Sequence, residues 1–244
     1  MLRRSKRAQE GFHPLHRAVI DQGGFRAALG AEDVAALLAS FAAHDETQRR
    51  PLPQPLVDVA VPVVRVLAVD LAPGAAIDLA LDVRGATIKE KTTPRFDVPL
   101  TFEQQHRRVR KVSRKISTDT WLWAHARLRD KTTLELTISD TVRDDKITKT
   151  GASGKTKLKR KYRRTRRITS KLALPTARQI IDPGQASPLT SVTWKLGERH
   201  PTVTAKTQVD LDSPPPVPEL QLVLLAMGEP FRWAPPLDLV KRPA

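Results

Sequence analysis

The spacing of apolar residues changes from a helical period to a two-residue period near residue 50. Within AEDVAALLASFAAHD, the apolar residues recur at helical spacing: Val34, Leu37, Leu38 and Phe41. Glu32 and Asp33 suit the first turn of a helix, where the helix dipole favours acidic side chains. The sequence therefore predicts an amphipathic helix. We expect its apolar face to pack on the rest of this chain, and docking to another subunit is the alternative.

Later segments alternate apolar and polar residues, which is the pattern of strands with one buried face. Segments 56–63 and 77–83 would form a hairpin around the turn at 72–74. Further predicted strands are 121–128, 134–142, 191–196 and 202–211. Residues 220–227 would form either a last strand or an extension that adds to a partner.

Short strands separated by turn signals predict a mainly β fold, built as an antiparallel β-sandwich or barrel-like body. Helix is expected mainly before Gln48, including a shorter segment from about Pro14 to Ile20. The chain would have three parts: an N-terminal basic arm and helical segment (1–50), a β domain (56–212), and a Pro-rich C-terminal extension (213–244). The extension opens with SPPPVP, a stiff polyproline spacer.

The longest predicted element is a β-hairpin over about 134–172 that projects into solvent. Its register follows if Ala152, Ser153 and Gly154 form a three-residue loop with Gly154 in the left-handed conformation. The pairs set opposite each other are then Ile138 and Ile168, Leu134 and Leu172, Asp140 and Arg166, Asp145 and Lys161, and Arg143 and Arg163. This register gives the hairpin an apolar root and a cationic tip.

The net charge of +16 comes from three stretches that contain no Asp or Glu. Residues 3–7, 107–115 and 155–171 carry four, six and ten basic residues, so the remaining chain holds 22 bases and 26 acids. A slightly acidic body with concentrated basic segments is typical of proteins that bind nucleic acid or another polyanion.

The basic residues of 155–171 alternate along the chain, so five of them would form one row on a strand. Tyr162 is the favoured aromatic for stacking on bases. Trp121 and Trp123 are expected to pack beneath the N-terminal helix, and stacking on unpaired bases is the alternative for this pair. The N-terminal arm, with Arg3 and Arg4, would add contacts. The predicted nucleic-acid-binding residues are Lys155, Lys157, Lys159, Lys161, Tyr162, Arg163, Arg164, Arg166, Arg167, Arg107, Arg108, Arg110, Lys111, Arg114 and Lys115.

Sequence motifs for catalysis are weak, so we expect no enzyme, no metal site and no cofactor. GASGKTK resembles a phosphate-binding loop, but Lys149 stands where that motif needs its first glycine. Asp144, Asp145 and Lys146, with Asp130 upstream, resemble part of a metal-dependent nuclease site, although these residue types are common. The chain has no Cys, and its six His residues are scattered.

These features predict a nonenzymatic polyanion-binding protein, with nucleic acid bound through its phosphates and little sequence specificity. The alternative is a structural subunit of a phage-like particle or other large assembly, using the basic hairpin as an inter-subunit arm. Membrane-surface binding is a third option, but it needs more apolar residues at the hairpin tip than Leu158 and Tyr162. We expect neither a signal peptide nor a transmembrane segment, and a location in the cytoplasm or within a virion-like particle.

Overall fold

The computed structural model describes residues 11–44, 51–151, 153–175, 180, 186–197 and 200–235. The fold is mainly β, with 43% strand and 29% helix. The strands are β1 (Gly24–Leu29), β2 (Ile77–Asp82), β3 (Phe96–Val98), β4 (Val109–Arg127), β5 (Thr133–Thr150), β6 (Thr156–Ala173), β7 (Thr190–Lys195) and β8 (Thr202–Asp210). The helical elements are α2 (Pro14–Gln22), α3 (Ala31–Ala42), η1 (Leu56–Ala60), α5 (Val61–Val69), η2 (Lys89–Lys91), α6 (Phe102–His106) and α7 (Glu219–Trp233).

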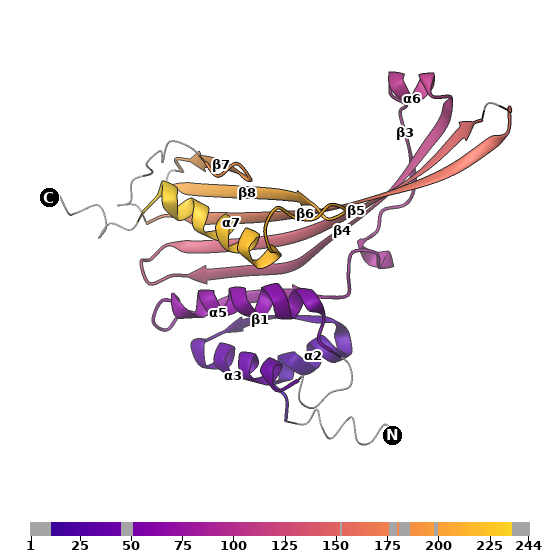
Figure 1. The fold of residues 1–244 in the computed structure, drawn as a ribbon. Coiled ribbons are helices and arrows are strands. Elements are labelled where there is room, and N and C mark those ends of the chain that lie inside the picture. Colours follow the sequence, from indigo (N-terminus) through magenta and orange to yellow (C-terminus); the bar gives the residue numbers. More distant parts are fainter. Residues whose placement is uncertain are drawn as a thin grey trace.

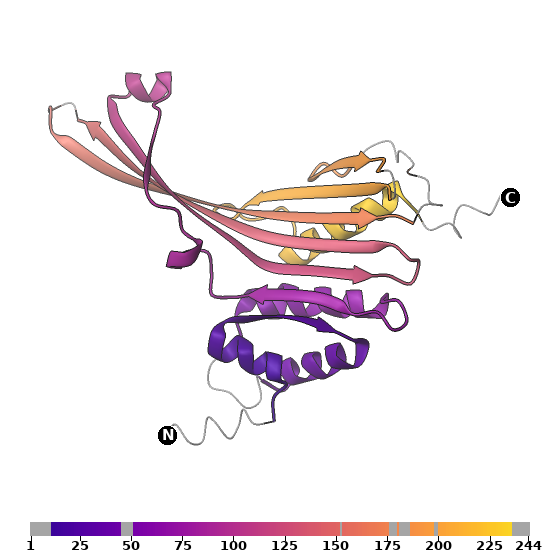
Figure 2. The ribbon, with the colours of Figure 1, turned by 180° about the vertical axis from the view of Figure 1, so that it is seen from behind.

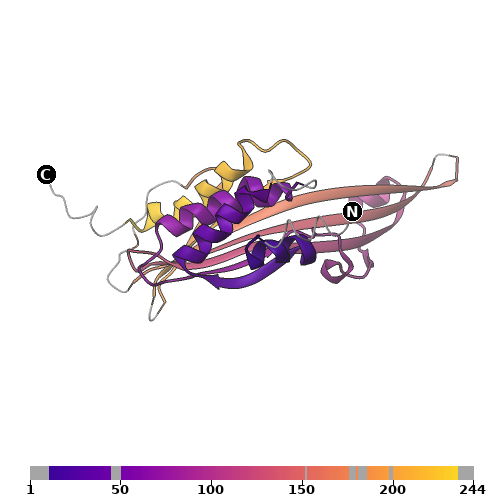
Figure 3. The same ribbon diagram turned by 90° about the horizontal axis from the view of Figure 1, so that it is seen from below.

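The eight strands form one antiparallel sheet in the order β1-β2-β4-β5-β6-β8-β7, and β3 pairs with β4. Helices α3, α5 and α7 lie on one side of this sheet (Figures 1 and 3). Figure 2 shows the strands from the opposite, open side. The expected sandwich or barrel is not confirmed, because the second layer over the described strands is helical.

The core lies between the sheet and the helices. Alternate residues of the central strands are buried there, as the two-residue period predicts: Leu122, Ala124, Ala126, Leu134, Leu136, Ile138, Ile168 and Leu172. Residues at helical spacing cover them from the other layer: Leu37, Leu56, Val59, Val63, Leu67, Leu222 and Val223. Burial of this apolar surface is the main favourable term that holds the two layers together.

The predicted hairpin is confirmed with its register. Ile138 pairs with Ile168, and the other four predicted pairs are also opposite each other. Gly154 is left-handed, with a φ of 75°, and the Gly151 N–H donates to the Lys155 carbonyl at 2.8 Å. Of the three predicted loop residues, Ala152 lies outside the described part of the chain. The turn therefore sets the register along the whole length of β5 and β6.

The two N-terminal helices are confirmed as α2 and α3. Gly23 ends α2 in a left-handed conformation, with a φ of 78°, which favours glycine. Of the four residues that defined its apolar face, helix α3 buries Val34, Leu37 and Phe41, and Leu38 is half-buried against the core. This helix packs mainly on α5, α2 and β1 of the same chain.

The prediction of a strand over 56–63 is wrong, because η1 and α5 form a continuous helical segment there. A run that is almost entirely apolar fits both the helical and the two-residue period, so the alternation of valines alone did not distinguish a strand from a helix. The buried residues follow the helical period instead: Leu56, Val59, Ala60, Val63, Val64 and Leu67. The turn at 72–74 thus joins a helix to β2, and the expected first hairpin does not form.

The C-terminal region also corrects the prediction, because residues 220–227 belong to helix α7. Leu222, Val223, Ala226 and Met227 are buried at helical spacing against β6 and β8. Helix is therefore not confined to the residues before Gln48. Strand β1, at the edge of the sheet, was not predicted at all.

Candidate nucleic-acid interface

The first halves of β4 and β6 and the second half of β5 extend past the helical layer as a ribbon of three long strands, and the short strand β3 pairs with the outer side of β4 (Figure 1). Strand β8 stops pairing with β6 at Thr165, although the Leu211 N–H still donates to the Arg164 carbonyl at 2.8 Å. Among the described residues, 156–163 therefore pair with β5 alone. Eight residues of a strand span about 26 Å. We call residues 107–117 and 142–164, which make up this ribbon, the arm.

Nearly all of the net charge lies on the arm. It holds 16 Lys and Arg residues and two Asp residues, which gives +14 of the chain total of +16. The remaining chain has 26 bases and 24 acids. The fold thus brings together two basic stretches that the sequence separates, and the third, residues 3–7, lies outside the described residues.

Strand register sorts the arm residues onto two faces. Arg114, Asp145 and Lys161 lie on one line across β4, β5 and β6, so they share a face. Following the alternation from this line gives the cations of that face: Lys149, Arg143 and Arg114, with Lys157, Lys159, Lys161 and Arg163 on β6. We call this the ladder face. Its four β6 members are all exposed, so their charges are accessible to a polyanion.

Asp145 is the acid of the ladder face, and two arginines neutralise it. Its carboxylate accepts from Arg114 Nε at 2.8 Å and from Arg143 Nε at 2.7 Å. Burial favours a higher pKa for Asp145, but the hydrogen bonds from Arg143 and Arg114 outweigh it and lower the pKa. Lys161, although opposite Asp145, remains exposed. The carboxylate therefore fixes the arginines and leaves the lysine row available.

Tyr162 lies on the other face of the arm, opposite Asp144, and is 58% exposed. Asp144 forms ion pairs with Arg95 and, at 3.8 Å, with Arg160. Lys146 of this face is exposed as well. Both faces of the arm are therefore cationic, but the tyrosine predicted to stack on bases is not beside the lysine row.

Arg166 holds the fold together at the root of the arm. Only 5% exposed, it donates to both Asp140 oxygens at 2.6 Å and contacts Glu219 at the start of α7. Its guanidinium carbon lies 5.1 Å from the centre of the Trp121 ring. Because it is buried, Arg166 is not accessible to nucleic acid, although it was among the predicted binding residues. Arg167, the next residue, is exposed.

Other predicted cations of the arm already have carboxylate partners. Lys111 forms an ion pair with Asp97 at 2.9 Å, and Arg164 with Asp212 at 2.8 Å. Arg107 pairs with Glu103 on α6, where both side chains are largely exposed. Exposed pairs of this kind contribute little to stability, so a polyanion can compete for the cations. Residues Arg108, Arg110 and Lys115 complete the set on or beside β4.

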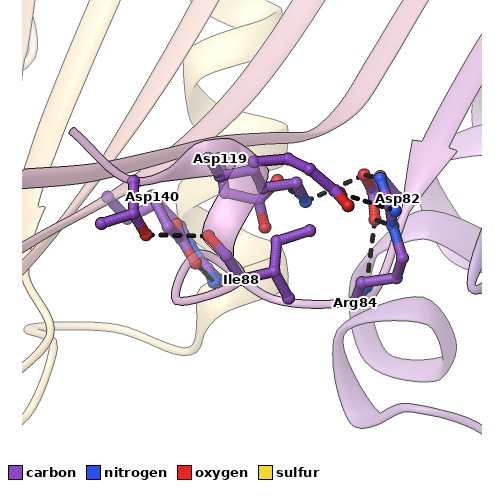
Figure 4. A network of polar contacts seen from close by, with 9 residues as sticks. Asp82, Arg84, Ile88, Asp119 and Asp140 are labelled. Carbon is purple, nitrogen blue, oxygen red and sulfur yellow. Dashed lines mark hydrogen bonds and ion pairs between the residues drawn. The ribbon is translucent and has the colours of Figure 1, made fainter. Parts of the chain in front are cut away.

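A network of polar contacts lies at the root of the arm (Figure 4). Lys91 bridges Asp119 and Asp82, the latter at 2.9 Å, and Arg84 Nη2 donates to Asp82 at 2.9 Å. Burial alone would raise the pKa of Asp82, but its bonds to Arg84 and Lys91 lower it. The pKa of Asp119 is raised, mainly by burial. This network ties the segment between β2 and β3 to β4.

A β-bulge places the two tryptophans, both expected beneath the N-terminal helix, on opposite sides of the sheet. The register shifts between Thr120 and Leu122, which turns Trp121 into the core, where it is buried. Trp123 lies on the open side of the sheet, where its ring stacks with His125 and Arg26 lies over it. Packing beneath the N-terminal helix is therefore wrong for Trp123.

The motifs considered for catalysis are placed apart or in other roles. GASGKTK forms the hairpin turn and continues as strand β6, whereas a phosphate-binding loop continues as a helix. Asp130 lies in the turn between β4 and β5, at the opposite end of these strands from Asp144. The described side chains therefore do not assemble the carboxylate set considered from the sequence.

Comparison with known proteins identifies no relative of this chain. The chain matches no family model, and neither the curated proteins nor the solved structures include a significant match. Across the described ranges, every helix is too short or too polar to cross a bilayer.

Proposed function

We propose that this protein binds nucleic acid through the phosphates, using the arm, without catalysing a reaction. The observation that carries the proposal is the location of the charge, since +14 of the net +16 lies on one projecting ribbon. Phosphate contacts give affinity that depends little on sequence. We propose the cytoplasm or a virion-like particle as its location, because nucleic acid is accessible in both.

Stability of the fold gives no other reason for this charge. The exposed lysines of β6 lie beyond the helical layer, and the structural cations, such as Arg166 and Lys91, already have buried or part-buried partners. Like charges on adjacent ladder positions repel each other at low salt. Binding of a polyanion would neutralise these charges and replace their repulsion with attraction, which is the simplest explanation for the arm.

A direct test is fluorescence anisotropy with labelled 20-nucleotide DNA and RNA at salt concentrations from 50 to 200 mM. We expect binding whose logarithmic affinity falls linearly with the logarithm of salt concentration, because each phosphate contact releases counterions. Base sequence should change the affinity little. Absence of binding at 50 mM salt would refute the proposal.

Assembly with other subunits is the second candidate, and the open edge of β6 favours it. Among the described residues, no strand pairs with 156–163 on the side away from β5. An unpaired edge can add a strand from another chain. Sedimentation or light scattering distinguishes the candidates, because a ring or higher oligomer without nucleic-acid affinity would favour the assembly role.

A further inference from the structure

We infer that the ladder face binds single-stranded nucleic acid, with Phe96 as a platform on which an unpaired base stacks. This inference rests on the proposed function, because it specifies the ligand of the same arm. Two observations carry it: the row of cations along β6, and the position of Phe96 on the face that bears this row.

The cation row suits a strand that can follow a straight path. From Lys157 to Arg163 the row covers six residue-to-residue steps, or about 20 Å, with a cation about every 6.6 Å. In duplex DNA a phosphate strand makes one full turn in about 34 Å. Over 20 Å it passes more than halfway around the axis and leaves the row. A single strand is flexible enough to stay on all four cations.

Phe96 supplies an aromatic ring on the ladder face. Strand β3 pairs with β4 so that Phe96 is opposite Arg114, and Arg114 is opposite Asp145 and then Lys161. These four residues therefore form one line across the ribbon, about 14 Å long at the usual strand spacing. The Phe96 side chain is 45% exposed, although it is large and apolar. An exposed ring beside arginines is the arrangement on which unpaired bases stack.

The arginines between Phe96 and the row make a continuous path. Asp145 fixes Arg143 and Arg114 in place between β6 and β3. Planar guanidinium groups hold phosphates and also stack on bases. A strand that crosses the ribbon obliquely from the lysines would therefore meet the cluster of Arg143, Asp145 and Arg114, two cations and one anion, on its route to Phe96.

A membrane surface fits this distribution less well, because the exposed apolar residues do not share a face. Phe96 lies on the ladder face, whereas Leu158 and Tyr162 lie on the other face. An element that lies on a bilayer gathers its apolar side chains on one side. The arrangement favours one stacked base over insertion into lipid.

The test compares a 20-nucleotide single strand with a 20-base-pair duplex of the same sequence at 150 mM salt. We expect the single strand to bind at least 10-fold more tightly. Phe96→Leu keeps an apolar side chain but removes the ring, so single-strand affinity should fall about 5- to 100-fold. Its salt slope and the duplex affinity should not change, and Phe96→Trp should preserve tight single-strand binding.

Phe102→Leu is the matched control, because Phe102 is also exposed but lies on α6, outside the Phe96 to Lys161 line. It should leave both affinities unchanged. Duplex binding as tight as single-strand binding, or a silent Phe96→Leu, would overturn the inference while the proposed function stands. If neither nucleic acid binds, both fail, and binding to phosphatidylserine vesicles would then identify a membrane ligand.

Discussion

Basic residues in and beside the arm have two different roles, which side-chain burial distinguishes. Arg166 and Arg167 are neighbours in one basic run, yet the first is buried between two carboxylates and the second is exposed. The predicted hairpin register already paired Arg166 with Asp140, which is one of its two carboxylate partners. The contribution of Glu219 was not visible, because the helix that carries it was not predicted.

Arg166→Gln should strongly destabilise the protein, because it leaves Asp140 and Glu219 without their cation at the root of the arm. Breaking a buried ion pair typically costs about 3 to 5 kcal/mol. Arg167→Gln, the matched control, should change the free energy of unfolding by less than about 0.5 kcal/mol. Urea unfolding measures both. Equal effects would show that Arg166 does not hold α7 to the sheet.

His16 should make the protein less stable in mild acid. It is fully buried, with Nε2 3.0 Å from His44 Nδ1 and Nδ1 2.9 Å from Ser40 Oγ. Burial, with a smaller effect from His44, lowers the His16 pKa from 6.5 to about 4. The unfolded chain therefore takes up a proton between pH 6.5 and 4 that the folded chain does not. Stability is full above pH 6.5 and falls by about 3 kcal/mol towards pH 4.

His16→Gln provides the comparison, since glutamine does not titrate. The unfolding free energy of this variant should fall less steeply than that of the wild type between pH 6.5 and 4. Parallel curves for the two proteins would show that His16 is not responsible for the acid sensitivity. Chemical denaturation at half-unit pH intervals supplies the measurement.

Elements with a turn and two distinct faces were predictable, whereas continuous apolar runs were not. Gly154 and the apolar pairs fixed the register of β5 and β6, because a shift by one residue would have exposed the core face. Residues 56–63 are almost entirely apolar, so their period was ambiguous. Their packing against the sheet as part of the helical layer, which depends on the tertiary fold, buries them at helical spacing. The bulge at Thr120 was equally invisible in the sequence.

The open edge of β6 leads to a prediction about association. Charged side chains on an edge strand discourage pairing with another chain. Replacing Lys157, Lys159 and Lys161 with Val should therefore produce larger species, detected by light scattering at 150 mM salt. Replacing the same lysines with Gln removes equal charge without adding apolar β-branched side chains, and should preserve the wild-type size. A Val variant of unchanged size would contradict the open edge.

At the scale of the whole molecule, the fold separates a nearly neutral body from a cationic arm. The sequence showed three basic stretches but not which of them meet in space. Pairing of β4 with β5 joins 107–115 to the ladder, and β3 brings in Phe96 from outside both. Candidate residues chosen by charge alone therefore included Arg166 and omitted Phe96, Arg143 and Lys149.

The most direct test of the arm is the salt dependence of nucleic-acid binding after three charges are removed. Lys157, Lys159 and Lys161 changed to Gln should leave the melting temperature nearly unchanged, because these side chains are exposed. Lys131, Lys195 and Lys206 changed to Gln are the matched control, since they are exposed lysines outside the arm.

The slope of log affinity against log salt should fall by about 2 to 3 for the arm variant, at about 0.7 per lost contact for a single strand and 0.9 for a duplex. The control variant should keep the wild-type slope. Equal slopes for wild type and arm variant, with both folded, would contradict the claim that the arm binds the phosphates.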